Sequence, residues 1–176
     1  KIQFHVELCC KFYLFDPKRF GSFEQKWIGP NKKDSLQDKI TKLREKQFPL
    51  LFDKHTEKIL ENLEFNPLKA IQECYLAASL YLPIDAAINE LPKAYQKCVV
   101  GFWVYYNQLV LEDHYSYALI EKKQWLLPTN SITNWCNASE IRNKILKALE
   151  NKKAPQVYKK SGAVVEKFFV VWWDQK

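Results

Sequence analysis

The stretch IQFHVELCCKFYLF, residues 2–15, alternates between two kinds of side chain and decides how the fold is interpreted. Its even positions, from Ile2 to Leu14, are all apolar, whereas the odd positions include His5, Glu7 and Lys11. Because side chains on a β-strand point to opposite faces in turn, this pattern predicts a strand. We expect the even set to face a hydrophobic core and the odd set to share the other face.

The odd face places a carboxylate, an imidazole and an amine side by side, on Glu7, His5 and Lys11. Such a face is used by metal-dependent enzymes that act on phosphodiesters, but a half-exposed strand with a surface charge pair has the same pattern. His5 is more typical of a rim residue than of a metal ligand. Both interpretations of Glu7 and Lys11 stay open from the residues alone.

The composition indicates one globular domain of 176 residues with a net charge of +7. A basic balance favours a polyanionic partner such as DNA or RNA, although scattered surface lysines would produce the same charge. The five cysteines form no C-x-x-C pair, which argues against a zinc site and a disulfide framework and favours a reducing cytoplasm. Neither a membrane-spanning window nor a signal peptide is expected. The sequence does not predict an oligomeric state.

The beginning of the sequence has two unusual features. There is no methionine, and the chain starts inside a strand pattern. We therefore expect that residues upstream of Lys1 are missing.

The remaining pattern predicts an α+β or mixed α/β domain with the order β-α-α-β-β-β-α-β. Residues 16–33 are rich in Gly, Pro and Asn and indicate turns. The other expected elements are a helix capped by Asp34 that stops near Pro49, a helix over 53–63 with Ile59, Leu60 and Leu63 inward, strands over 70–82, 99–106, 115–127 and 164–173, and a helix that begins at Asn137 or Ser139.

Two lysine-rich segments can be interpreted in two ways. The loop over 26–33 contains Lys26, Lys32 and Lys33 around Trp27 and could hold phosphates, or it could be a rigid connector with a packed Trp. Residues 151–160 are more typical of a solvated face. We assign Trp103, Trp125 and the pair at 172–173 to packing.

Several blocks together resemble a bacterial family of uncharacterised proteins, domain of unknown function 1853, which is grouped with the PD-(D/E)XK nuclease superfamily. The blocks are His5 to Leu14, Gly29-Pro30-Asn31 with Asp34, Leu36 and Lys39, Lys46-Gln47, Gly101-Phe102-Trp103, Lys123 to Pro128, and Glu166 with Phe169-Val170-Val171. The resemblance implies a restriction-endonuclease-like mixed sheet flanked by helices.

The resemblance also implies Mg²⁺- or Mn²⁺-dependent hydrolysis of nucleic acid, because hard carboxylate oxygens suit these cations and the cation activates water. Glu7 would be the metal ligand, Lys11 would stabilise the reacting phosphate, and Gln47 would brace the site. Lys26, Lys32, Lys33 and Lys39 are candidates for contacts with nucleic acid.

Two departures from the superfamily pattern favour an inactive scaffold that binds nucleic acid or a protein. Three residues separate Glu7 from Lys11 where one is usual, which is about 13 Å between Cα atoms on a regular strand unless a bulge at Cys9-Cys10 shortens it. The acidic strand that should precede Glu7 is absent from the sequence. We expect this chain alone to be inactive.

Overall fold

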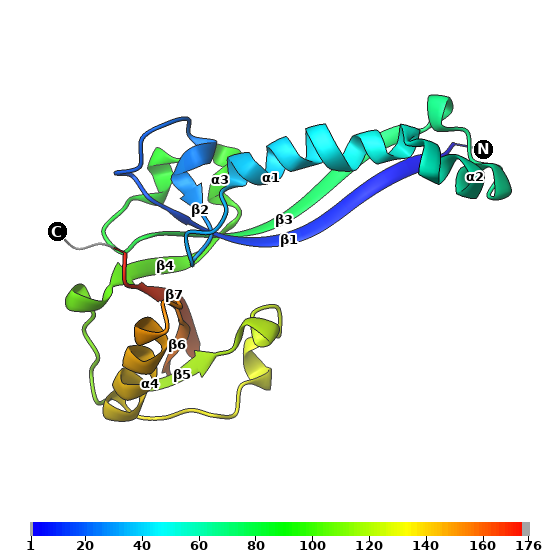
Figure 1. Cartoon of the computed structure of the whole chain (residues 1–176). Coiled ribbons are helices and arrows are strands. Elements are labelled where there is room, and N and C mark those ends of the chain that lie inside the picture. Colours follow the sequence, from blue (N-terminus) through cyan, green and yellow to red (C-terminus); the bar gives the residue numbers. More distant parts are fainter. Residues whose placement is uncertain (1, 174–176) are drawn as a thin grey trace.

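The computed structural model describes residues 2–173. It contains one mixed sheet of seven strands in the order β2-β1-β3-β4-β7-β6-β5, and four α-helices (Figure 1). The strands are β1 Phe4–Phe15, β2 Trp27–Ile28, β3 Ile71–Pro83, β4 Val99–Tyr105, β5 Ser116–Ile120, β6 Gln156–Ser161 and β7 Val164–Val171. The helices are α1 Leu36–Lys42, α2 Lys54–Asn62, α3 Lys93–Gln96 and α4 Ala138–Glu150. The coarse prediction of a mixed α/β domain is confirmed.

Strands β1, β3, β4 and β7 are parallel to their neighbours in that series, whereas β2, β6 and β5 join antiparallel. The connection from β1 to β3 passes through α1, the helical turns over 43–52, and α2. Such a crossover is what two parallel neighbouring strands require. None of the helices in the described part of the chain is long and apolar enough to cross a membrane.

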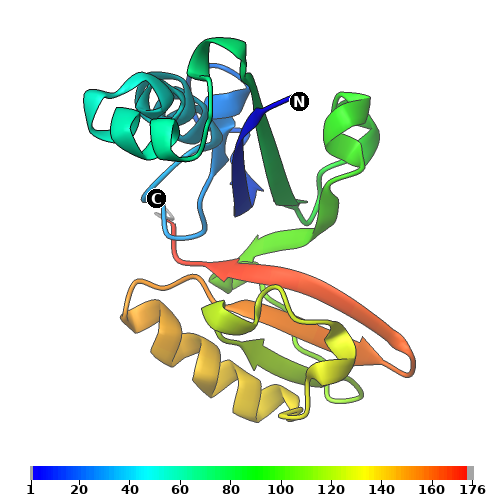
Figure 2. The ribbon, with the colours of Figure 1, turned by 90° about the vertical axis from the view of Figure 1, so that its right-hand side faces the viewer.

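The molecule has two regions of different character (Figures 1 and 2). We call residues 2–10 and 44–77 the arm, because the outer parts of β1 and β3 project as a two-stranded ribbon with helical turns along one side. We call the other described residues the body. In the body, α4 packs on the sheet formed by β5, β6 and β7, and its Ile141 and Ile145 are fully buried.

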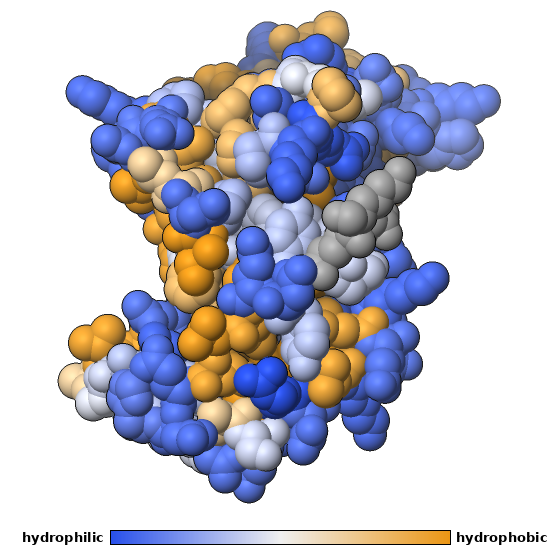
Figure 3. Space-filling view, turned by 90° about the vertical axis from the view of Figure 1, so that its left-hand side faces the viewer, coloured by the Kyte–Doolittle hydropathy of each residue, from blue (hydrophilic) through white to orange (hydrophobic). Residues whose placement is uncertain are grey.

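The body contains the hydrophobic core. One cluster joins Leu14, Tyr81, Trp103 and Phe169 on one side of the sheet, and another joins Tyr13 and other residues on the opposite side. Figure 3 views the end of the molecule opposite the arm and shows apolar side chains gathered at a narrowed waist. Because β1 and β3 are buried on both faces here, they show the near-continuous apolar runs of parallel strands.

The predicted orientation of β1 is wrong over its outer half. Phe4, Val6 and Leu8 are 47%, 48% and 72% exposed, whereas His5 and Glu7 are half-buried. The helical turns after α1 cover the odd face. The odd face is therefore the more buried one in the outer half of β1, although the alternation alone had predicted burial of the even face. Only near the body, at Leu14, does the even face enter the core.

The cap of α1, the end of its helical path and the buried face of α2 also differ from the prediction. Ser35, not Asp34, caps α1, because its hydroxyl accepts from the Asp38 amide while the Asp38 carboxylate accepts from the Ser35 amide. The helical path continues past Pro49 because this proline opens a 3₁₀ turn over Phe48–Phe52. On α2, Ile59 and Leu63 are exposed because no described element covers that side of the arm tip.

Strand β6 and the short strand β2 were not predicted. β6 lies inside the segment interpreted as a solvated lysine-rich face, yet Gln156, Val157 and Tyr158 are fully buried between β5 and β7. β2 holds Trp27 at zero exposure, which confirms the packed connector in place of a base-stacking loop. The predicted strand over 115–127 ends at Ile120, where a 3₁₀ turn begins.

Candidate functional site

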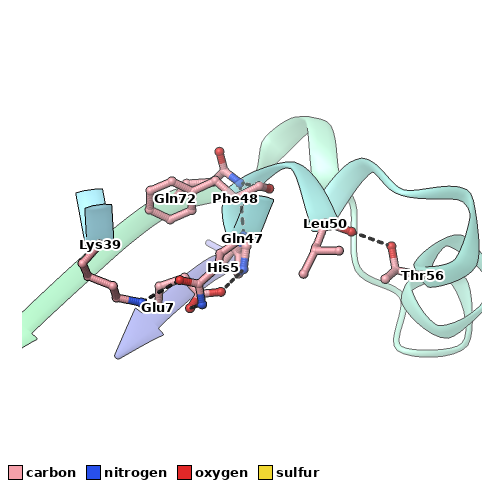
Figure 4. Close-up of polar contacts among 8 residues, drawn as sticks. All are labelled: His5, Glu7, Lys39, Gln47, Phe48, Leu50, Thr56 and Gln72. Atoms are coloured by element: carbon pink, nitrogen blue, oxygen red, sulfur yellow. Dashed lines mark hydrogen bonds and ion pairs between the residues drawn. The ribbon is translucent and has the colours of Figure 1, made fainter. Parts of the chain in front are cut away.

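Glu7 lies at the centre of a polar cluster between β1 and the helical turn that follows α1 (Figure 4). Gln47 donates through Nε2 to Glu7 Oε2 at 2.8 Å, and Lys39 donates through Nζ to Gln47 Oε1 at 2.6 Å. On the other side, His5 Nε2 lies 3.6 Å from Glu7 Oε1. The structure therefore brings together Glu7 and Gln47, as predicted, and adds Lys39 to them.

The backbone explains why these groups meet. His5 and Glu7 share the odd face of β1, which the helical layer covers, and His5 also packs edge-on against Phe48 from that layer. The segment Leu43–Gln47 is a π-helical turn. Such turns are frequent at functional sites, and here the turn ends at Gln47, which bonds Glu7.

Lys11 does not join this cluster. The register between β1 and β3 runs without a break from Phe4 to Leu14, so there is no bulge at Cys9-Cys10 to shorten the path from Glu7. Lys11 instead pairs with Asp34 at 2.6 Å, beside the start of α1. The amine that is linked to Glu7 is that of Lys39, through Gln47.

The polar cluster does not make a complete metal centre from protein ligands. Among residues 2–173, no group of three or more His, Cys, Asp or Glu side chains is placed to hold a metal ion. Glu7 is a hard oxygen donor that suits Mg²⁺, but its nearest neighbours are an amide donor and an imidazole. The residues present therefore fit one metal contact and not a resident site.

Two thiols lie on the same face as Glu7. Burial raises the pKa of the Cys74 thiol, and the neighbouring Cys9 thiol raises it further. Protonated thiols are weak nucleophiles and poor metal ligands. The raised pKa therefore argues against Cys74 as a nucleophile in this cluster.

Lys11 opens onto a second site, which we call the cationic cleft. It consists of two adjoining cavities of about 370 and 520 Å³ that share Lys122 and Trp125. The first cavity is lined by Lys11, Asp34 and Lys123 as well, and the second by Lys153 and Asn31. Four lysines from three separate parts of the chain thus line the two cavities of the cleft, with Asp34 and Glu121 as the acidic members.

Two of these lysines are available to bind an anion. Lys11 forms an ion pair with Asp34, and Lys123 Nζ lies 3.0 Å from Glu121 Oε2. Lys122 and Lys153 are exposed and have no ion pair within the described residues. The cleft is therefore positively charged where it opens to solvent.

Hydrogen bonds fix the loop that walls the cleft. Asn31 accepts through Oδ1 from the Ala154 amide at 2.9 Å, and the Pro30 carbonyl accepts from Trp173 Nε1 at 3.2 Å. These bonds tie the loop after β2 to the distant end of the chain. Trp125 forms an apolar wall, because its ring packs edge-on against Phe12 and Phe169.

The other predicted phosphate contacts are dispersed. Lys32 lies over the Trp173 ring at 5.1 Å, and Lys33 is exposed next to it. Lys26 is half-buried in the 3₁₀ turn over Glu24–Lys26. Lys39 is committed to Gln47.

Sequence reasoning missed Lys122, Lys123 and Lys153. The first two were read as part of a strand, and the third as part of a solvated face. The sequence does contain one signal for the turn that presents them: Glu121 and Gln124 form a capping box, which a Glu-x-x-Gln spacing can indicate.

The chain matches the family described as Domain of unknown function (DUF1853) over residues 1–171, and it belongs to this family. No curated protein and no solved structure matches it.

Proposed function

We propose that this domain binds nucleic acid in the cationic cleft, on a scaffold related to the PD-(D/E)XK nucleases. The observation that carries the proposal is that Lys11, Lys122 and Lys153, from parts of the chain far apart in sequence, line two adjoining cavities that share Lys122 and Trp125. Because the net charge is +7, the whole molecule also attracts a polyanion. Phosphates are the anions that such an arrangement of amines fits best.

The energetics favour binding of the backbone over reading of the bases. An amine that neutralises a phosphate releases condensed counterions, and this release dominates affinity at low salt. Lys122 and Lys153 lose no existing ion pair when a phosphate arrives. In contrast, the ring of Trp125 already packs edge-on against Phe12 and Phe169, which disfavours stacking on a base. We therefore expect little sequence preference.

The crossover from β1 to β3 supports the nuclease-like scaffold. It joins two parallel strands through a helix, with an acidic residue on the first strand and a glutamine on the helix that bonds it. The resemblance implies that Gln47 braces Glu7, and their hydrogen bond supports this part of the likeness, whereas Lys11 lies apart and pairs with Asp34. Likeness of fold alone does not define an activity.

Binding is tested with two double variants of equal charge. We expect Lys122→Ala with Lys153→Ala to weaken binding of labelled DNA severalfold and to lower the salt slope by about 1.8, because about 0.9 is lost for each phosphate contact. The control, Lys54→Ala with Lys58→Ala on α2, lowers the net charge by the same two units at the arm tip. Fluorescence anisotropy across a salt series measures both. Equal weakening by the two pairs would show that only net charge matters.

Mg²⁺-dependent hydrolysis at Glu7 is the second candidate function. The hydrogen bond from Gln47 to Glu7, with Lys39 behind it, favours this candidate because it orients a carboxylate. The cluster supplies one metal contact, so the remaining ligands would have to be substrate oxygens or belong to another polypeptide.

Cleavage of plasmid and single-stranded DNA with Mg²⁺ or Mn²⁺ separates the two candidates. We expect this chain and its Glu7→Gln variant to leave DNA equally intact while both retain binding. The matched control is Glu57→Gln on α2, far from the cluster along the chain. Metal-dependent cutting that Glu7→Gln removes and Glu57→Gln preserves would establish hydrolysis in place of binding alone.

A further inference from the structure

One face of the arm is apolar and uncovered. It consists of the even residues of β1 and of the residues of β3 in register with them. Its apolar members are Ile2, Phe4, Val6, Leu8, Ile71 and Tyr75, which are between 47% and 74% exposed. Figure 1 shows the helical turns along the other side of the ribbon, and no described element lies along this side of its outer half.

The size of this face is at the upper end of what a soluble monomer exposes. From their exposed fractions, the six residues present on the order of 600 Å², at the upper limit of a single apolar patch on a monomer. The two strands are also parallel to each other, and parallel strands occur almost only with both faces covered. The outer half of β1 and β3 is thus an incomplete sheet.

The edges of the ribbon are open as well. On its outer edge, β1 pairs with β2 only at Leu14 and Phe15. On the opposite edge, β3 pairs with β4 only from Leu80 onward. The outer ribbon therefore has no neighbour on either edge within the described residues, and both strands present unpaired backbone groups there.

We propose that two copies of this chain associate through this face, with the two ribbons packed against each other about a two-fold axis. Two such faces would together bury on the order of 1,200 Å², which reaches the lower limit of a specific, stable interface. A two-fold contact uses the same patch twice, so each copy supplies the apolar surface that the other lacks.

The distribution of charge favours a second copy over a polyanion on this face. The arm carries five Lys and Arg against seven Asp and Glu, a net charge of −2, which leaves +9 for the rest of the +7 chain. Two arms of net charge −2 therefore repel each other much less than two bodies of net charge +9 would. The interface would involve none of the lysines of the cationic cleft, and the proposal is independent of nucleic-acid binding.

Glu73 is the charged residue on this face within the described residues. It is in register with Val6 and is half-buried. Its carboxylate accepts from the Tyr75 hydroxyl at 2.7 Å, which satisfies part of its hydrogen-bonding capacity. The remaining capacity can be met by water at the open edge of β3, so this carboxylate does not have to be desolvated in the dimer.

Sedimentation of the full chain across a range of concentrations tests the proposal. We expect a reversible monomer–dimer equilibrium that Leu8→Glu weakens at least about tenfold, because two unpaired carboxylates would be buried in each dimer. The matched control is Val164→Glu, a residue of β7 in the body that is 63% exposed. A monomer at every concentration, or equal weakening by the two variants, would overturn the proposal.

Hydrogen exchange of the unmodified chain makes the test independent of whether Leu8→Glu folds. We expect protection of residues 4–10 and 71–77 to rise with protein concentration while that of residues 141–149 stays constant. Unchanged protection of both segments would also overturn the proposal, and the face would then serve a different polypeptide.

Discussion

The arm and the body are built from the same two strands, yet they differ in how completely those strands are covered. In the body, Tyr13 and Leu14 are both at zero exposure although they point to opposite faces of the sheet. In the arm, Leu8 is 72% exposed while its neighbour Glu7 is half-buried. Alternation in a sequence therefore indicates that the two faces of a strand differ. The neighbouring elements decide which of the two faces is buried.

The largest effect that separates the two regions is expected from loss of a core side chain. Phe169 is fully buried and packs against Tyr81 and Trp125, so Phe169→Ala should lower the free energy of unfolding by about 3–5 kcal/mol. Leu8→Ala in the arm should change the stability of the monomer by less than about 0.5 kcal/mol. Urea denaturation at concentrations that keep the chain monomeric measures both. A similar loss from each variant would mean that the arm face is covered within one chain.

The second largest loss of stability is expected from a larger side chain between two paired strands of the body. A methyl group on Gly101 of β4 would overlap the carbonyl oxygen of Lys167 in β7 and press on the Tyr81 ring. Gly101→Ala should therefore destabilise the chain by about 2–3 kcal/mol, because two paired strands would have to separate.

The matched change in the arm is Ala77→Val, at an exposed position of β3 on the open face. We expect a change of less than about 0.5 kcal/mol in the monomer, since a β-branched side chain suits a strand and meets no neighbour there. Thermal melts of both variants decide the point. If Ala77→Val cost as much as Gly101→Ala, the arm would be as tightly packed as the body.

The arm and the body also show which elements of the fold could be predicted from the sequence. The main strands and α4 were predicted because their signals are local: alternation in β1, β-branched and aromatic runs in β3, β4 and β7, and an Asn137 cap before a helical period. β6 was missed because its buried segment is only three residues long and is flanked by lysines. Its burial depends on β5 and β7, which no local pattern reveals.

The candidate site was likewise predictable only in part. Glu7 and Gln47 were predicted from the resemblance, and they do bond to each other. Lys11 was assigned to Glu7 because both share a strand face, but Asp34 arrives beside Lys11 through the pairing of β2 with β1. The role of Lys122 and Lys153 depends on a loop and a strand that meet only in the folded chain, so spacing could not indicate it.

A smaller effect is expected where the helical layer of the arm begins. Ser35→Ala removes the cap of α1 and should cost about 1 kcal/mol. Asp34→Asn leaves this cap in place and removes only a partly exposed ion pair with Lys11, so its cost should be lower than that of Ser35→Ala. Chemical denaturation ranks the two variants. The reverse order would assign the cap to Asp34, as the sequence alone had suggested.

The smallest effect is expected at the arm tip, as a dependence on pH. The amide and side chain of His55 hydrogen-bond to Asp53, and these bonds lower the pKa of the Asp53 carboxyl below its usual value near 3.8. Because the folded state has the lower pKa, the ionised carboxylate stabilises α2 fully above the unfolded value, and this contribution is lost as the pH falls through the folded value. We expect the amide signals of α2 to change below about pH 4 before those of the body do. Asp53→Asn keeps an acceptor at the helix cap and removes the titration, so its α2 signals should be insensitive over that range; a transition at the same pH in Asp53→Asn would show that another group controls the arm tip.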